Sequence, residues 1–168
     1  LPFGLAVDHA NNILTSGQFS GPTDFDPGIN LQSLSGQAGS FDAYMAKYNS
    51  NGNYIFANRI GGNMLDCAYA IHAMADSSIL LSGFFNLTAD FDPSVSIASL
   101  TSAGAGDIFM ARYSSSGNYI VAQKIGGAGF DFSRNAVTDN QEKRCPRRMG
   151  HLKIVACSNK LTAIPKRN

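Results

Sequence analysis

Two pairs of aspartates, each pair separated by one phenylalanine, are the residues of this chain best suited to chemistry. Asp24 and Asp26 stand in an Asp-Phe-Asp-Pro motif, and Asp90 and Asp92 stand in the same motif 66 residues later. Carboxylates at positions i and i+2 of a loop can turn toward one hard cation, and Ca²⁺ takes about six to eight oxygen ligands from such loops. These four aspartates are therefore the candidate metal ligands.

A turn-forming role is the alternative for the same aspartates, and it is the one that the sequence favours. An aspartate in a loop commonly accepts hydrogen bonds from backbone N–H groups close by, here with Phe25 or Phe91 as the buried anchor. The full spacing of a calcium-binding EF-hand loop is absent from the chain. We therefore expect no cofactor, with Ca²⁺ as the one exception left open.

The elements that must position these loops are repeated along the chain. Residues 42–62 and 107–127 are identical at 13 of 21 positions. A fixed period of this length indicates one supersecondary unit that stacks on copies of itself, because a single unit cannot bury its own faces.

Each unit is expected to contain four short strands joined by tight turns. In the second unit the expected strands are 69–74, 78–85, 107–113 and 119–125, and in the first they are about 4–8, 12–19, 41–48 and 53–60. Clusters of Gly, Asn and Ser between apolar runs predict hairpins. The strands themselves are almost continuously apolar, which is typical of strands covered on both faces. Four antiparallel strands in each of several like units predict β-propeller blades.

The predicted fold class is all-β, an incomplete β-propeller of two four-stranded antiparallel blades plus the start of a third. Its expected parts are blade 1 (1–62), blade 2 (63–127), the first strand of a third blade (128–140) and a basic tail of uncertain order (141–168). Residues 1–140 carry 5 Lys and Arg against 11 Asp, whereas the tail carries 8 Lys and Arg against 1 Glu. Such a shift in charge marks a boundary.

Other aspartates recur at equivalent places, which argues for structural roles. Asp42 and Asp107 open the third strand of their units, and Asp66 and Asp131 stand at the start of the following unit. A residue repeated in every unit serves all of them alike, whereas general acid–base catalysis needs one distinct site. We therefore expect these carboxylates to form turns and strand starts.

Several motifs together resemble a known family. Thr/Ala-Asp-Phe-Asp-Pro, Asp-x-x-Met-Ala-Lys/Arg-Tyr, Gly-Asn-Tyr-Ile and Ile-Gly-Gly resemble the bacterial β-propeller repeats called SBBP repeats, over about residues 1–139. The resemblance implies a secreted or cell-surface protein of many tandem blades, hence an extracellular or cell-surface location. It implies no assigned activity and no catalytic residues.

The favoured function is a non-catalytic structural or binding module, a fragment of a larger secreted or cell-surface repeat protein. The connections 20–40 and 86–106 would present its contact surface to a protein or polysaccharide ligand, since recognition usually sits in loops on a rigid scaffold. Two alternatives stay open. One is a fragment of a Ca²⁺-dependent propeller hydrolase or lyase, and the other is a truncated or frameshifted gene product without activity, because the blade pattern stops after residue 140.

Further partners are expected from the incomplete fold. Two blades cannot close a ring, so apolar blade faces should stay exposed and meet further propeller blades or copies of the chain. No nucleic acid is expected, because a basic run alone is more often a solvated tail. No apolar run reaches the length of a membrane span, so none is expected.

Overall fold

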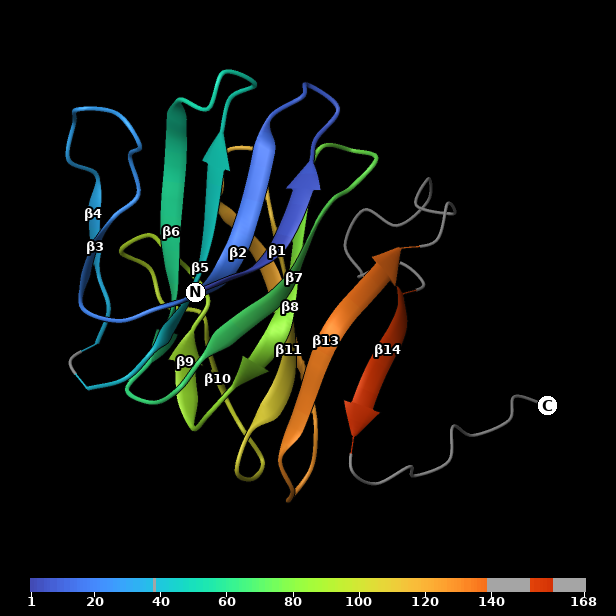
Figure 1. Ribbon diagram of the computed structural model, residues 1–168. Coiled ribbons are helices and arrows are strands. Elements are labelled where there is room, and N and C mark those ends of the chain that lie inside the picture. The colour runs from blue at the N-terminus through green and yellow to red at the C-terminus, as the bar shows by residue number, and fades with distance from the viewer. Residues whose placement is uncertain (38, 139–151, 159–168) are drawn as a thin grey trace.

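The computed structural model describes residues 1–37, 39–138 and 152–158, and the side chains of residues 1–37 and 39–136. All regular structure in these ranges is β-strand (Figure 1). The first blade comprises β1 (Pro2–Val7), β2 (Ile13–Phe19), β5 (Asp42–Tyr48) and β6 (Tyr54–Gly62). The second comprises β7 (Cys67–Ala73), β8 (Ile79–Phe85), β11 (Asp107–Tyr113) and β12 (Tyr119–Ile125).

The two blades have the same antiparallel topology, which confirms the predicted fold class. Within blade 1 the strands lie in the order β1-β2-β5-β6, and within blade 2 the order is β7-β8-β11-β12. The middle strands are the most buried, with every residue of β8 buried and six of the seven residues of β5. Continuous apolar runs were expected of such strands, because neighbouring layers cover them on both faces.

A third unit begins with β13 (Asp131–Thr138), which pairs with β14 (Leu152–Ser158). β14 lies in the segment expected to be a basic tail of uncertain order, and it takes the place of the second strand that the sequence pattern did not show in the third unit. The register slips between Ser133 and Asn135, as it slips between Pro2 and Gly4 in blade 1 and between Ala68 and Ala70 in blade 2. The run Leu-Lys-Ile-Val-Ala-Cys-Ser explains the strand, since it is rich in apolar and β-branched residues. The rest of the predicted tail lies outside the described residues.

The long connection in each blade holds a short hairpin that the sequence did not predict. We call these hairpins the first arm, formed by β3 (Pro22–Asp24) and β4 (Ser33–Ser35), and the second arm, formed by β9 (Thr88–Asp90) and β10 (Ser99–Thr101). The second arm leaves its own blade and pairs with β6 of blade 1. A single six-stranded sheet, β1-β2-β5-β6-β9-β10, therefore crosses the junction between the two units.

The largest core cluster lies between the two blades. It joins Leu14 and Met45 of blade 1 to Ile71, Leu81 and other residues of blade 2, all of them almost fully buried. A second cluster lies on the opposite face of blade 1, beneath the first arm. Figure 1 shows the first arm and the β13–β14 hairpin at opposite ends of the row of blades.

Candidate functional site

The Asp90–Asp92 motif ends the first strand of the second arm and folds into a tight turn. Oδ1 of Asp90 accepts hydrogen bonds from the backbone N–H groups of Asp92 at 3.0 Å and Ala98 at 2.9 Å. Oδ1 of Asp92 accepts one from the N–H of Ser94 at 2.9 Å. Phe91, between them, is fully buried. The turn-forming role favoured by the sequence is confirmed for both carboxylates.

The Asp24–Asp26 motif has the same geometry in the first arm. Oδ1 of Asp24 accepts the N–H groups of Asp26 at 3.0 Å and Gln32 at 2.9 Å, and Oδ1 of Asp26 accepts that of Gly28 at 2.8 Å. Phe25 is the buried anchor here. The structure thus keeps the two pairs of aspartates in separate arms, so that each pair would act alone.

Calcium binding by these aspartates stays a prediction. In all four carboxylates Oδ1 is used by the turn, and Oδ2 has no hydrogen-bond or ion-pair partner among the described residues. Within residues 1–37 and 39–136, no three His, Cys, Asp or Glu side chains gather closely enough to hold a metal ion. A Ca²⁺ ion at either turn would therefore take most of its oxygens from backbone carbonyls and water.

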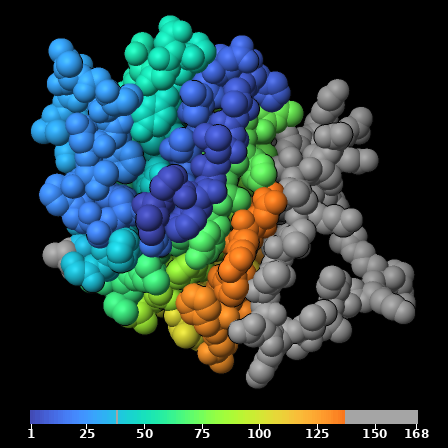
Figure 2. Space-filling view, in the orientation of Figure 1, coloured from blue at the N-terminus to red at the C-terminus, as the bar shows by residue number. Residues whose placement is uncertain are grey.

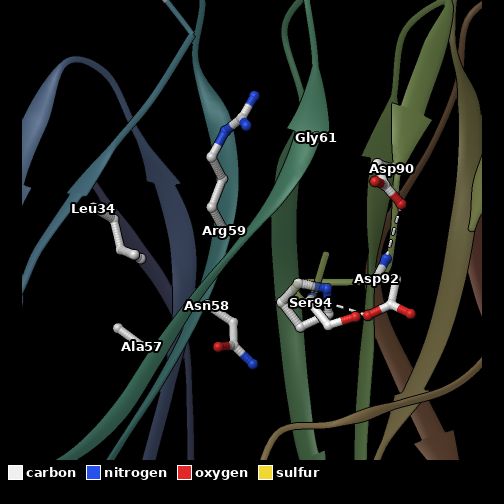
Figure 3. A pocket seen from close by; sticks show the side chains of 9 residues that line it. Leu34, Ala57, Asn58, Arg59, Gly61, Asp90, Asp92 and Ser94 are labelled. Atoms are coloured by element: carbon white, nitrogen blue, oxygen red, sulfur yellow. Dashed lines mark hydrogen bonds between the residues drawn. The ribbon is translucent and has the colours of Figure 1, made fainter. Parts of the chain in front are cut away.

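A pocket of about 230 Å³ lies between the two arms, over the outer strand β6 (Figure 3). The second arm contributes its acidic turn to one wall, and β6 and the first arm contribute the rest. The lining residues are Leu34, Ala57, Asn58, Arg59, Gly61, Asp90, Asp92, Pro93 and Ser94. One of the two predicted aspartate pairs therefore faces a pocket, whereas Asp24 and Asp26 are not among its lining residues.

The one cation in the pocket wall is already neutralised. Nε of Arg59 lies 2.9 Å from Oδ2 of Asp42, and its Nη2 donates a hydrogen bond to Oδ1 of the same carboxylate at 3.2 Å. Asp42 is fully buried. Asp90 and Asp92 form no ion pair among the described residues. The pocket consequently carries net negative charge and suits a ligand that brings a cation or several hydrogen-bond donors.

The ion pair of Arg59 with Asp42 was missed by sequence reasoning, although a signal for it was present. Arg59 and Lys124 occupy the same place in the two units, each directly before Ile-Gly-Gly. Lys124 in turn has its Nζ 3.4 Å from Oδ2 of the buried Asp107, the equivalent of Asp42. A basic residue recurring beside a recurring aspartate would have predicted both pairs.

A second buried carboxylate, Asp66, joins the blades behind the pocket. Its Oδ2 accepts the N–H of Gly62 at 2.7 Å, and its Oδ1 accepts the N–H of Asn86, in blade 2, at 3.1 Å. Burial, and to a lesser degree the neighbouring charge of Asp42, raises the pKa of Asp66 to about 7. The strand-start role expected for Asp66 is confirmed. Through these two hydrogen bonds Asp66 also links blade 1 to blade 2.

The second arm approaches β6 closely, so that the pairing between β6 and β9 can be tested by substitution of a glycine. A Cβ atom on Gly62 would overlap the carbonyl oxygen of Thr88, whereas a Cβ on the equivalent Gly127 would meet nothing within 4 Å. We expect Gly62→Ala to lower the free energy of unfolding by about 1–3 kcal/mol. Gly127→Ala should change it by less than about 0.5 kcal/mol. Urea denaturation of both variants measures the difference, and equal effects would contradict the β6–β9 pairing.

The part of the chain that the structure describes contains no helix that could span a membrane. No known protein-family profile matches the sequence. The chain is similar to the uncharacterized WD repeat-containing protein L264 of Acanthamoeba polyphaga mimivirus, with 28% identity over 146 residues. That match covers 82% of this chain, which spans only 10% of the viral protein. Together with the antiparallel blades, the similarity indicates a repeat protein of the β-propeller type.

Proposed function

We propose that the chain is a non-catalytic binding module, part of a larger propeller-type repeat protein, and that it recognises its ligand in the pocket between the arms. The observation that carries this proposal is the pair of carboxylates, Asp90 and Asp92, that face the pocket with Oδ2 unpartnered among the described residues. They are held by a turn whose Phe91 anchor is fully buried. Rigidly placed polar groups in a concave site are typical of recognition.

The ligand that fits this pocket best is a protein segment with a Lys or Arg side chain. An ammonium or guanidinium group would meet the free Oδ2 atoms of Asp90 and Asp92. The outer edge of β6 next to them pairs with β9 only at Gly61 and Gly62, and the N–H of Ala57 on this edge already donates a hydrogen bond to the hydroxyl of Tyr54 at 2.9 Å. The two carboxylates, rather than pairing with the strand edge, would therefore hold the segment. Propeller-type repeats in the viral relative support the same class of module, a scaffold for binding.

Two finer parts of the proposal rest on the sequence motifs. The likeness to SBBP repeats supports a bacterial repeat protein that works outside the cell or at its surface. A polysaccharide is the alternative ligand, since hydroxyl groups also donate hydrogen bonds to carboxylates. The enzyme alternative, a Ca²⁺-dependent hydrolase or lyase, would need a non-repeated cluster of acidic or histidine side chains.

A peptide array with graded Lys and Arg content tests the proposal. We expect the wild-type chain to bind peptides with a basic side chain in an extended run, and the Asp90→Asn/Asp92→Asn variant to bind them at least about tenfold more weakly. Asparagine keeps an oxygen at each Oδ1 position, so the turn can keep its backbone hydrogen bonds. The matched control is Asp24→Asn/Asp26→Asn, which should bind like the wild type.

Three outcomes would count against the proposal. Equal binding by both double variants would remove the pocket as the site. Binding that is independent of basic side chains would remove the charge argument. Selective binding to a glycan array, with no binding to peptides, would assign the pocket to polysaccharide instead.

A further inference from the structure

One face of blade 1, on the side away from blade 2, is uncovered along β1. Leu5 and Val7 of β1 are 72% and 59% exposed. Figure 2 shows the N-terminal strand in dark blue at the surface of the molecule. Large apolar side chains exposed in a row on a strand indicate a surface that another element covers.

The second blade shows what covers the equivalent face. Leu5 lies opposite Thr15 in the β1–β2 register, and Ile71 lies opposite Leu81 in the β7–β8 register, each two residues after the same bulge. Leu5 and Ile71 are therefore equivalent positions. Yet Ile71 is only 2% exposed, against 72% for Leu5.

The group that buries Ile71 is the preceding blade. A Cβ atom added to Gly4 of β1 would lie 3.2 Å from Cγ2 of Ile71, so the two blades touch there without space for a further atom. Ile71 belongs to the same core cluster as Leu14 and Met45 of blade 1. A unit that precedes blade 1 in the same way would bury Leu5 against its own equivalents of these residues.

The two arms differ in the same way, because the second arm pairs with the unit before it and the first arm does not. The edge of β9 pairs with the preceding unit, Asp90 with Gly61 and Ala89 with Gly62. In the first arm, Thr23 and Asp24 hold the equivalent positions, but β3 pairs with β4 alone among the described strands. Within the described part of the chain, blade 1 therefore has two unpaired surfaces, the apolar side chains of β1 and the free edge of β3. The equivalent surfaces of blade 2 are both in contact with blade 1.

We propose that this face of blade 1 binds a further repeat unit of the same kind. The unit would bring an outer strand that ends in Ile-Gly-Gly, whose glycines pair with β3, and an apolar face that covers Leu5 and Val7. Aspartate four residues after the second glycine, as Asp66 follows Gly62, would tie the new unit to blade 1. The two glycines would determine which units can bind, because a side chain at the position of Gly62 would overlap the arm.

The test places such a unit in front of the chain. A second copy of residues 1–66 is joined ahead of Leu1, so that Asp66 precedes Leu1 as it naturally precedes Cys67. Leu5→Lys is then made in the 168-residue chain and in the downstream copy of the tandem. We expect the melting temperature of the chain to change by less than about 1 °C, because the side chain is exposed, and that of the tandem to fall by more than about 5 °C.

The matched control is Ile97→Lys, which replaces a side chain that is 79% exposed at the tip of the second arm. It should change both melting temperatures by less than about 1 °C. Hydrogen exchange gives an independent readout, since pairing with a new strand should slow exchange of the Asp24 amide in the downstream copy at least about tenfold.

The remaining outcomes would each overturn the proposal. An equal, small effect of Leu5→Lys in both proteins would show that the face stays open. A tandem that melts below the 168-residue chain would show that the added unit does not dock. A concentration-dependent dimer of the 168-residue chain that Leu5→Lys dissociates, seen by sedimentation, would assign the face to a second copy of the chain.

Discussion

Replacing Phe91 with alanine is expected to lower the free energy of unfolding by about 3–5 kcal/mol, enough to unfold much of the chain at 37 °C. Phe91 is fully buried and follows directly after β9 in the second arm. Its ring lies 5.4 Å from that of Phe85 and 5.0 Å from that of Phe109, and its carbonyl oxygen accepts the hydroxyl hydrogen of Tyr113 at 2.9 Å. The cavity would open in the core shared by both blades, where no neighbour can move in to fill it.

The chain supplies its own control in Phe25. This ring lies 5.4 Å from Phe19 and 5.0 Å from Tyr44, which is the same arrangement in the first arm. Phe25 is 8% exposed, however, and its cluster lies on the face of blade 1 that no other blade covers. We expect Phe25→Ala to cost about half as much, because solvent can partly fill the space at this uncovered face. Urea denaturation compares the two variants, and equal costs would contradict the difference in cover.

The blade strands were predictable because each is a run of apolar and β-branched residues bounded by Gly, Asn or Ser. The strand predicted at 107–113 begins and ends where β11 does, and the turn predicted at 114–118 follows it. The internal repeat strengthened each strand prediction, since each expected strand occurs a second time in the other unit. The sequence could not show that blade 2 reaches across to β6, because that contact depends on the absence of side chains at Gly61 and Gly62.

The arms and the pocket were hidden for a different reason. Strands of three residues, such as β3 and β9, are too short to give an alternating pattern. Their stability comes from Phe25 and Phe91, which the sequence did mark as buried anchors, and from the aspartate turns. Arg59 was overlooked because a single arginine in a strand has no pattern of its own. Only the comparison with Lys124 reveals that the position is always basic.

The stability of the chain is expected to fall as the pH rises from about 4 to about 7, because of Asp66. Burial raises the pKa of this carboxyl from 3.8 to about 7, against the opposing hydrogen bonds from Gly62 and Asn86. Between these two values the folded chain keeps a proton that the unfolded chain has lost, so raising the pH favours the unfolded state. A shift of about three units corresponds to as much as about 4 kcal/mol across the window.

Two other carboxyls act in the opposite direction but outside this window. The pKa of Asp8 and that of Asp76 are lowered, despite partial burial, by hydrogen bonds from Lys47 and Asn12 to Asp8 and from Ser78 to Asp76. The stability that they add is lost only as the pH falls below about 4. A rise in stability from pH 8 down to pH 5 would therefore report on Asp66 rather than on these groups.

Urea denaturation of the wild type and of Asp66→Asn at pH 5 and pH 8 measures the contribution of Asp66. The variant loses one acceptor for the Gly62 and Asn86 amides, so we expect it to be less stable at pH 5 but to lack the wild-type loss on going to pH 8. Subtracting the two pH profiles cancels every other titrating group, since both proteins share them. Parallel profiles would show that Asp66 stays charged in the folded chain, and the junction between the blades would then owe nothing to its protonation.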